Sequence, residues 1–438
     1  MSFNESEERL GELTRRTFLS MWTYQNPHYA KGKELCDALV VFGDDVIIIS
    51  DKLIRFDDQI DKDTAWKRWY KKAVHGSIRQ LRGAFNQLTR FPQSIFCDVN
   101  ASSPFPLIIP EPKKIRVHLI AVANGCKAAN FHSTGHSEFC IDTRCNSDES
   151  PMCVGVKHPE FVHIFSTSAL EAIFNCFDTT RDLIDYLVRK QNALSGEVPF
   201  FIHGEENLVA AYVMSQSGNS DFYVPINYFP IERGVKTVPA RLWDLYKKSP
   251  LREKRDQTRS TSYIIDQLID HMTEEYSSGS LLIGQNQPFS YHEKHLRIMA
   301  SESRLSRQIM SETLQGIIFE SPSTFWCNIS ESKDNPGLLY LWLVYPLIPG
   351  HITDEELETI LNRHLYQYLI VALYKFPLAT SIFGICLPNH ASNRISRGFQ
   401  VISGEARCNN LKEHANILEQ KLGLLNNIQT YSFTSQRL

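Results

Sequence analysis

The sequence predicts a mixed α/β protein, because segments with helical periodicity alternate with short runs of strand composition in its first and last thirds. A chain of 438 residues is too long for one ordinary core, so two or three domains are expected. The α/β pattern covers residues 1–123 and 321–438, and residues 161–320 are mainly helical. Residues 124–160, rich in Ser, Asn, Gly, Cys and His, are expected to form an irregular connection.

The first block is expected to begin with a helix at residues 5–22, followed by two strands that fold back at a Gly-Asp-Asp turn. A long amphipathic helix follows at about 64–88. Residues 91–99 and 114–123 have the composition of further strands. The order of elements is therefore helix, hairpin, helix and strands.

Beyond the connection, helical periodicity and strand-like apolar runs alternate again. The expected helices are 166–193, 204–216, 258–276, 290–318, 353–375 and 410–424. The expected strands are 323–330, 338–346 and 381–388. The charged, proline-flanked segment 247–260 is expected to be an exposed linker, and the alternative is the solvated start of a helix.

The composition is that of a globular protein, with 42% hydrophobic residues, 22% charged residues and a net charge of −3. A net charge this small does not indicate any class of binding partner, so a surface that binds nucleic acid would have to be a local basic patch. The N-terminus has no signal-peptide core, and no apolar run approaches the roughly 18 residues of a membrane helix. The ten cysteines have no disulfide rhythm. These features predict a cytoplasmic protein that does not enter the membrane.

The predicted hairpin contains charged residues among apolar ones. Asp37 interrupts its first strand, and Asp51 and Lys52 close the second. A buried charge is costly unless it is paired or binds a metal. A two-residue turn places Asp37, Ser50 and Lys52 on one face of the sheet, whereas a three-residue turn pairs Asp37 with Asp51. Carboxylates beside a lysine suit a hard divalent cation together with a phosphate or an attacking water.

The spacing of Asp37 and Lys52 resembles that of the PD-(D/E)XK nuclease superfamily. Its restriction-endonuclease-like fold has the same order of elements, and the resemblance covers about residues 5–123. It implies that Asp37 binds Mg²⁺ or Mn²⁺ and that Lys52 orients or activates the attacking water. The predicted fold is therefore a restriction-endonuclease-like N-terminal domain followed by a larger helical and α/β module.

One position departs from the superfamily's pattern, because Ser50 stands where the second acid is expected. Asp51 is the first candidate to replace that acid, if a β-bulge turns it inward. Glu12 on the first helix and Glu34 before the hairpin are the other candidates for the metal site. The alternative function is a catalytically degenerate nuclease fold that binds nucleic acid or protein.

Gln80 lies toward the apolar stripe of the helix at 64–88, where an amide needs a hydrogen-bond partner. In Mrr-like and Holliday-junction-resolvase-like branches of the superfamily, a glutamine on this helix points into the active site, and "RQLRGA" resembles that element. The resemblance therefore adds Gln80 to the catalytic set of Asp37, Asp51 and Lys52. The alternative is a core amide bonded to the backbone.

The same helix is basic and contains no acid from Ala65 to Arg90. The residues expected to bind nucleic acid are Lys67, Arg68, Lys71, Lys72, Arg79 and Arg82. Lys and Arg contacts to phosphates supply most sequence-independent affinity. The predicted function is metal-dependent hydrolysis of phosphodiesters, with DNA favoured over RNA. Fold analogy adds a role in restriction or anti-phage defence, gated by a protein partner or a second copy of the chain that the C-terminal module binds.

Cys and His residues crowd the connection and its flanks. They are Cys126, His132, His136, Cys140, Cys145, Cys153, His158 and His163. Structural zinc sites usually have tight ligand pairs, and only the Cys140–Cys145 and His132–His136 spacings come close to this rule. Isolated thiols in a polar loop are expected, and a zinc-stabilised interaction protein is the alternative.

Overall fold

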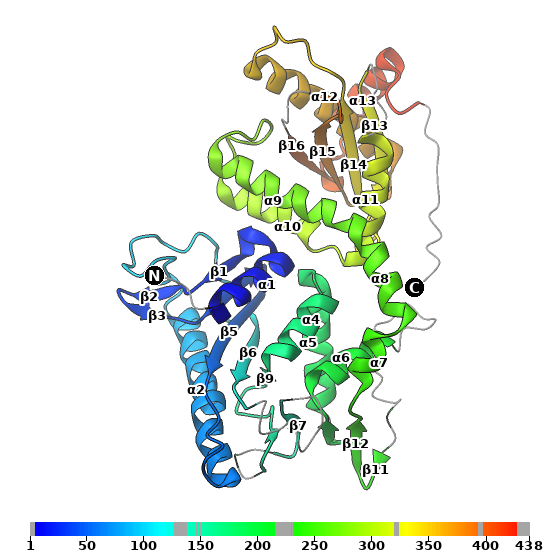
Figure 1. Cartoon of the computed structure of the whole chain (residues 1–438). Helices are drawn as coiled ribbons and strands as arrows, with labels where there is room; N and C mark the ends of the chain where they lie inside the picture. The colour runs from blue at the N-terminus through cyan, green and yellow to red at the C-terminus, as the bar shows by residue number, and fades with distance from the viewer. Residues whose placement is uncertain are drawn as a thin grey trace. The chain divides into compact units, whose positions relative to one another are not determined.

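The computed structural model describes residues 5–126, 138–145, 148, 150–214, 229, 231–318, 324–392 and 397–426. It is a mixed α/β protein whose chain divides between Asp256 and Gln257 into two compact units (Figure 1). Within the described ranges, no helix combines the length and the apolarity needed to cross a membrane.

The first unit is built around a five-stranded sheet with the order β1-β4-β5-β6-β9. Its strands are β1 (Thr23–Gln25), β4 (Ala38–Phe42), β5 (Asp45–Leu53), β6 (Arg116–Asn124) and β9 (Val162–Phe165). The first three strands form an antiparallel meander, whereas β5, β6 and β9 run parallel. Along β5, apolar residues from both faces are buried, as expected for a strand with helices on both sides.

Helices cover both faces of this sheet. They are α1 (Glu5–Trp22), α2 (Lys62–Arg90) and α4 (Thr167–Cys176). Helix α2 lies on one side of the sheet and α4 on the other (Figure 1). Phe18 of α1 packs edge-on against Phe174 of α4, with ring centroids 5.9 Å apart. The chain order α1-β1-β4-β5-α2-β6 thus forms one layered core.

A second sheet in the same unit has the order β11-β12-β10-β7-β8. Its strands are β7 (Cys140–Asp142), β8 (Cys153–Val154), β10 (Phe200–Ile202), β11 (Ile231–Glu232) and β12 (Val235–Val238). A separate ribbon pairs β2 (His28–Ala30) with β3 (Lys33–Glu34). The remaining helices of the unit are α5 (Thr180–Leu194), α6 (Glu205–Met214) and α7 (Leu242–Lys247). Helix α8 (Pro250–Arg259) contains the point at which the chain passes from the first unit to the second.

The second unit combines helices with a four-stranded mixed sheet of order β13-β14-β15-β16. Its helices are α9 (Tyr263–Ser278), α10 (Phe289–Ala300), α11 (Arg304–Ile318), α12 (Asp354–Lys375) and α13 (Asn409–Leu422), with short 3₁₀ turns η1 (Ser260–Ser262) and η2 (Gly404–Ala406). Its strands are β13 (Trp326–Glu331), β14 (Leu338–Tyr345), β15 (Ser381–Pro388) and β16 (Gly398–Ser403).

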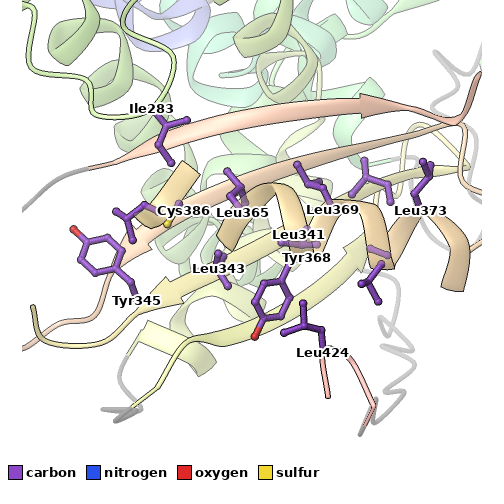
Figure 2. Close-up of a cluster of buried hydrophobic side chains, with 14 of the residues drawn as sticks. Ile283, Leu341, Leu343, Tyr345, Leu365, Tyr368, Leu369, Leu373, Cys386 and Leu424 are labelled. Atoms are coloured by element: carbon purple, nitrogen blue, oxygen red, sulfur yellow. The ribbon is translucent and has the colours of Figure 1, made fainter. Parts of the chain in front are cut away.

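The core of the second unit lies between α12 and its sheet. Figure 2 shows Leu365 and Leu369 of α12 over Leu341 and Leu343 of β14. Gly384 lies on the neighbouring strand β15, where a Cβ would come within 3.0 Å of Leu365 and Leu369. Glycine therefore lets the helix pack closely on the strand. The sequence "SIFGICLP" is in this way suited to a buried strand beneath a leucine-rich helix.

The structure differs from the sequence-based expectation in the first unit. Residues 91–99 form no strand, because the Asp98 carboxylate instead accepts main-chain N–H groups of Asn100, Ser102 and Ser103 and closes a loop. Pairing of β6 with β9 also joins residues on both sides of the expected boundary at 123. Segment 247–260, expected as a linker, is largely the helix α8.

Candidate functional site

The hairpin between β4 and β5 closes through a two-residue turn. Phe42 lies opposite Asp45, so the turn residues are Gly43 and Asp44. Gly43 has a φ of 62°, a conformation that glycine adopts without steric cost. The sequence allowed several turns at this point, and each would pair Asp37 with a different residue. The observed turn, with its register continued beyond the strand, places Asp37 opposite Ser50 and not opposite Asp51 or Lys52.

The ladder becomes irregular at Asp37. Its N–H donates to the Ile49 carbonyl at 3.1 Å, although Ile49 already lies opposite Ala38. Two residues of one strand therefore face one residue of the other, which is the pattern of a β-bulge. The carboxylate of Asp37 accepts the main-chain N–H of Asp51 at 2.9 Å. The bulge lies at Asp37 itself, and it fastens this carboxylate to β5 next to Lys52.

Negative charge gathers around Asp37. Burial raises the pKa of its carboxyl to about 6, against the lowering effect of the Asp51 N–H bond. The charges of Glu34 and Asp51 raise this pKa further, and the charge of Lys52 lowers it. The pKa of Glu34 is raised too, first by burial and then by Glu7. Ionisation of Asp37 and Glu34 is therefore unfavourable here, and a bound cation would make it less so.

Ser50 contacts Gln80 at the interface of β5 with α2, and Lys52 lies beside Gly76 of the same helix. The Ser50 hydroxyl donates to Gln80 Oε1 at 3.0 Å. A Cβ built on Gly76, one helical turn before Gln80, would lie 3.5 Å from Lys52 Cε. Ser50 and Lys52 therefore both face α2, as alternation along β5 requires. Ser50 therefore takes part in a hydrogen bond with Gln80.

The Asp51 side chain belongs to the other face of β5 by the same alternation. Its Oδ1 accepts a hydrogen bond from Asn124 Nδ2 at 3.0 Å. Asn124 Oδ1 in turn accepts the N–H and the hydroxyl of Thr167, at 2.7 and 2.6 Å, where α4 begins. The sequence analysis missed Asn124 and Thr167. The available signal was a polar residue directly after the buried run that ends at Ala123.

The two remaining acid candidates differ in position. Glu12 is exposed on α1. Glu34, at the end of β3, is the one whose charge acts on the Asp37 carboxyl. Within the described residues, no three His, Cys, Asp or Glu side chains are already arranged as a metal-ligand set. The candidate acids are therefore close enough to affect the pKa of Asp37, but their carboxylates do not converge on a single metal position.

The basic residues of α2 form an exposed face, while its tryptophans are buried. This α2 basic face consists of Lys67, Arg68, Lys71, Lys72, Arg79 and Arg82. Arg82 pairs with Glu160, with 3.0 Å between Nε and Oε2. Its charge is therefore partly offset by a protein partner.

Two histidines of the Cys/His group, His132 and His136, lie outside the described residues. Cys126 is buried, and its thiol donates to the Glu138 carbonyl at 3.4 Å. Burial lowers the pKa of His163 well below its ordinary value. Cys126 and His163 are therefore buried core residues.

Comparisons with protein-family models, with curated proteins and with solved structures found no match to this chain. Its function is therefore argued from the chemistry of its own residues.

Proposed function

We propose that this chain is a metal-dependent nuclease that hydrolyses phosphodiester bonds in DNA. The observation that carries the proposal is the fastening of the Asp37 carboxylate to β5 at Asp51, next to Lys52, in a local surplus of negative charge. The order α1-β1-β4-β5-α2-β6 supports a restriction-endonuclease-like fold for this part of the chain. The same resemblance implies a cytoplasmic role in restriction or defence against phage.

The residues fit a hard divalent cation in charge and in ligand type. Asp37 supplies carboxylate oxygens of the kind that Mg²⁺ and Mn²⁺ prefer, and Glu34 is the nearby acid that could join it. Asp51 adds negative charge, but its carboxylate bonds to Asn124 on the other face of β5, so it is not the inward-turned ligand that the sequence predicted. The pKa of Asp37 is raised mainly by burial and further by the charges of Glu34 and Asp51, and a bound cation would favour the ionised form against both effects. When bound, the ion polarises the phosphate and makes its water more acidic.

The chain's own groups have separate roles in this mechanism. Lys52 stabilises negative charge that develops on the phosphate. Gln80, held by the Ser50 hydroxyl, orients the attacking water. The α2 basic face binds the phosphates of the strand without reading its sequence. Since these contacts are not sequence-specific, specificity would come from other parts of the chain or from a partner.

A second candidate function is a degenerate nuclease fold that binds nucleic acid or a protein partner without cleaving it. The hydrogen bond between Ser50 and Gln80 favours it, because these two side chains occupy the position of the missing acid and bond to each other. Binding would then persist while metal ions have no effect on the substrate.

Cleavage of supercoiled plasmid in Mg²⁺, in Mn²⁺ and in EDTA tests the proposal. Lys52→Ala should reduce the rate by about 10²- to 10³-fold, as expected when one charge-stabilising group is removed. Lys33→Ala, which removes an exposed lysine of β3, is the matched control and should keep the rate. Cleavage that resists EDTA, or that is equal in the two variants, would assign the activity to a contaminant. Cleavage of RNA in the same assay decides the substrate.

Salt dependence of DNA binding tests the α2 basic face. Arg79→Gln should lower the slope of log K against log salt concentration by about 0.9, because one phosphate contact is lost. Arg82→Gln is the matched control one helical turn away. Its effect should be smaller, because Glu160 already offsets this charge. Equal slopes for wild type and Arg79→Gln would exclude the face as the binding surface.

A further inference from the structure

Three thiols and an imidazole from separate parts of the sequence meet on the second sheet of the first unit. Cys140 on β7 lies directly opposite Cys153 on the parallel strand β8. On the other side of β7, Ile141 lies opposite Ile202 of β10. His203 directly follows the end of β10, and its Nδ1 lies 3.9 Å from Cys140 Sγ. The backbone register thus places these side chains in one row across three strands.

The third thiol, that of Cys145, reaches the row from the turn after β7. The N–H of Cys145 donates to the Asp142 carbonyl at 3.0 Å, which bends the chain back. The Cys153 thiol is hydrogen-bonded to both Cys140 and Cys145. Cys140 is 1% exposed, and Cys145 and Cys153 are partly buried. The cluster is therefore compact and largely shielded from water.

We propose that Cys140, Cys145, Cys153 and His203 bind a structural zinc ion. Three sulfurs and one imidazole are the donor set of a closed tetrahedral zinc site. Tetrahedral zinc separates its sulfur and nitrogen ligands by about 3.5 Å, so Cys140 and His203 must approach by roughly 0.4 Å. As they stand, no three His, Cys, Asp or Glu side chains among the described residues are placed to hold a metal ion, so these four side chains would have to move together on binding.

A zinc ion at this position would stabilise the second sheet of the first unit. Strands β7, β8 and β10 have only three, two and three residues, too few to hold a sheet by their own pairing. An ion held by all three strands would fix their order and tie the turn at Cys145 to the sheet. Three thiolates around Zn²⁺ leave one negative charge, and Arg144 lies near both Cys145 and Cys153. The site is independent of the proposed nuclease function.

Metal analysis of the full chain, purified without chelator, tests the proposal. Wild-type protein should contain about one zinc per chain, and Cys153→Ser should lose most of it. Cys97→Ser, in which a partly exposed cysteine outside the cluster is replaced, is the control and should keep zinc. Asp37→Asn should also keep zinc, which separates this site from the proposed magnesium site. Equal zinc content in Cys153→Ser and Cys97→Ser would overturn the assignment.

Cobalt substitution provides a readout that needs no variant of the cluster. Co²⁺ added to metal-free wild-type protein should give the visible bands of a tetrahedral ion and the near-ultraviolet absorption of cobalt–thiolate bonds. Zinc should then displace it. Absence of these bands, together with a Cys140–Cys153 disulfide found by thiol counting under reducing-agent-free conditions, would show that the cluster is a redox pair and not a zinc site.

Discussion

Asp37→Asn is expected to abolish DNA cleavage while it stabilises the folded protein at neutral pH. Cleavage should fall by about 10³-fold or more, because a metal ligand contributes several kcal/mol to the transition state. Asparagine still offers an acceptor oxygen to the Asp51 N–H, so the β-bulge is kept. Plasmid cleavage in Mg²⁺ and urea denaturation of the same preparation measure the two effects together.

The stability gain has a defined pH dependence. The pKa of the Asp37 carboxyl rises from 3.8 to about 6 on folding, so the native state holds the proton more tightly than the unfolded chain. Wild-type stability attributable to this group is full below about pH 4 and is lost as the pH rises through 6. Asp37→Asn should therefore match wild type near pH 4 and exceed it by about 1 to 3 kcal/mol at pH 8 without metal. Mg²⁺ should then stabilise wild type more than the variant.

Asp45→Asn, at the other end of β5, is a control with the opposite sign. Burial acts to raise the pKa of Asp45, but hydrogen bonds from His118 and Arg116 outweigh it and lower the pKa. Its stabilising effect is present above the unfolded pKa and lost as the pH falls. Asp45→Asn should therefore destabilise the protein at pH 8, by about 1 to 3 kcal/mol. If Asp37→Asn cleaves DNA normally, or is destabilised like Asp45→Asn, the proposed role of Asp37 is wrong.

The hairpin and the helix after it were accessible from the sequence, because their signals are local. Gly43 permits the tight turn, and a continuous apolar run defines the strand on each side of it. The repeat of buried positions in α2 predicts which of its faces is basic and exposed. Helix α1 spans the expected residues, Glu5–Trp22, but its backbone is non-helical at Leu19, where φ is 63° and the helix is kinked.

Features that depend on distant pairing were not accessible. The bulge at Asp37 depends on which carbonyl its N–H meets across the hairpin, and the sequence carries no mark of it. The Cys/His cluster depends on β10 pairing with β7, which brings His203 to Cys140 from far along the chain. Strands of two or three residues have no detectable periodicity. The candidate ligand His203 was therefore absent from the sequence-based zinc alternative.

A buried ion pair between α5 and α6 gives the largest expected effect on stability. Lys190 is 0% exposed, and its Nζ lies 2.6 Å from Glu205 Oε2 and 4.6 Å from the ring centroid of Phe165. The Tyr186 hydroxyl donates to the other oxygen of Glu205 at 2.5 Å. Burial lowers the pKa of Lys190, against the attraction of Glu205. Lys190 and Glu205 therefore stabilise each other's buried charge, and the Tyr186 hydroxyl adds a hydrogen bond to Glu205.

Lys190→Met should therefore cost about 3 to 5 kcal/mol in the free energy of unfolding, because it leaves the Glu205 carboxylate buried without its cation. The double variant Lys190→Met, Glu205→Gln should recover most of this loss, since no charge remains and glutamine still accepts the Tyr186 hydroxyl. Urea denaturation of the wild type, the two single variants and the double variant completes a mutant cycle. A double variant as unstable as the sum of the single variants would mean that the two charges do not depend on each other. The cost of the single variant would then come from lost packing of the lysine side chain against Phe165.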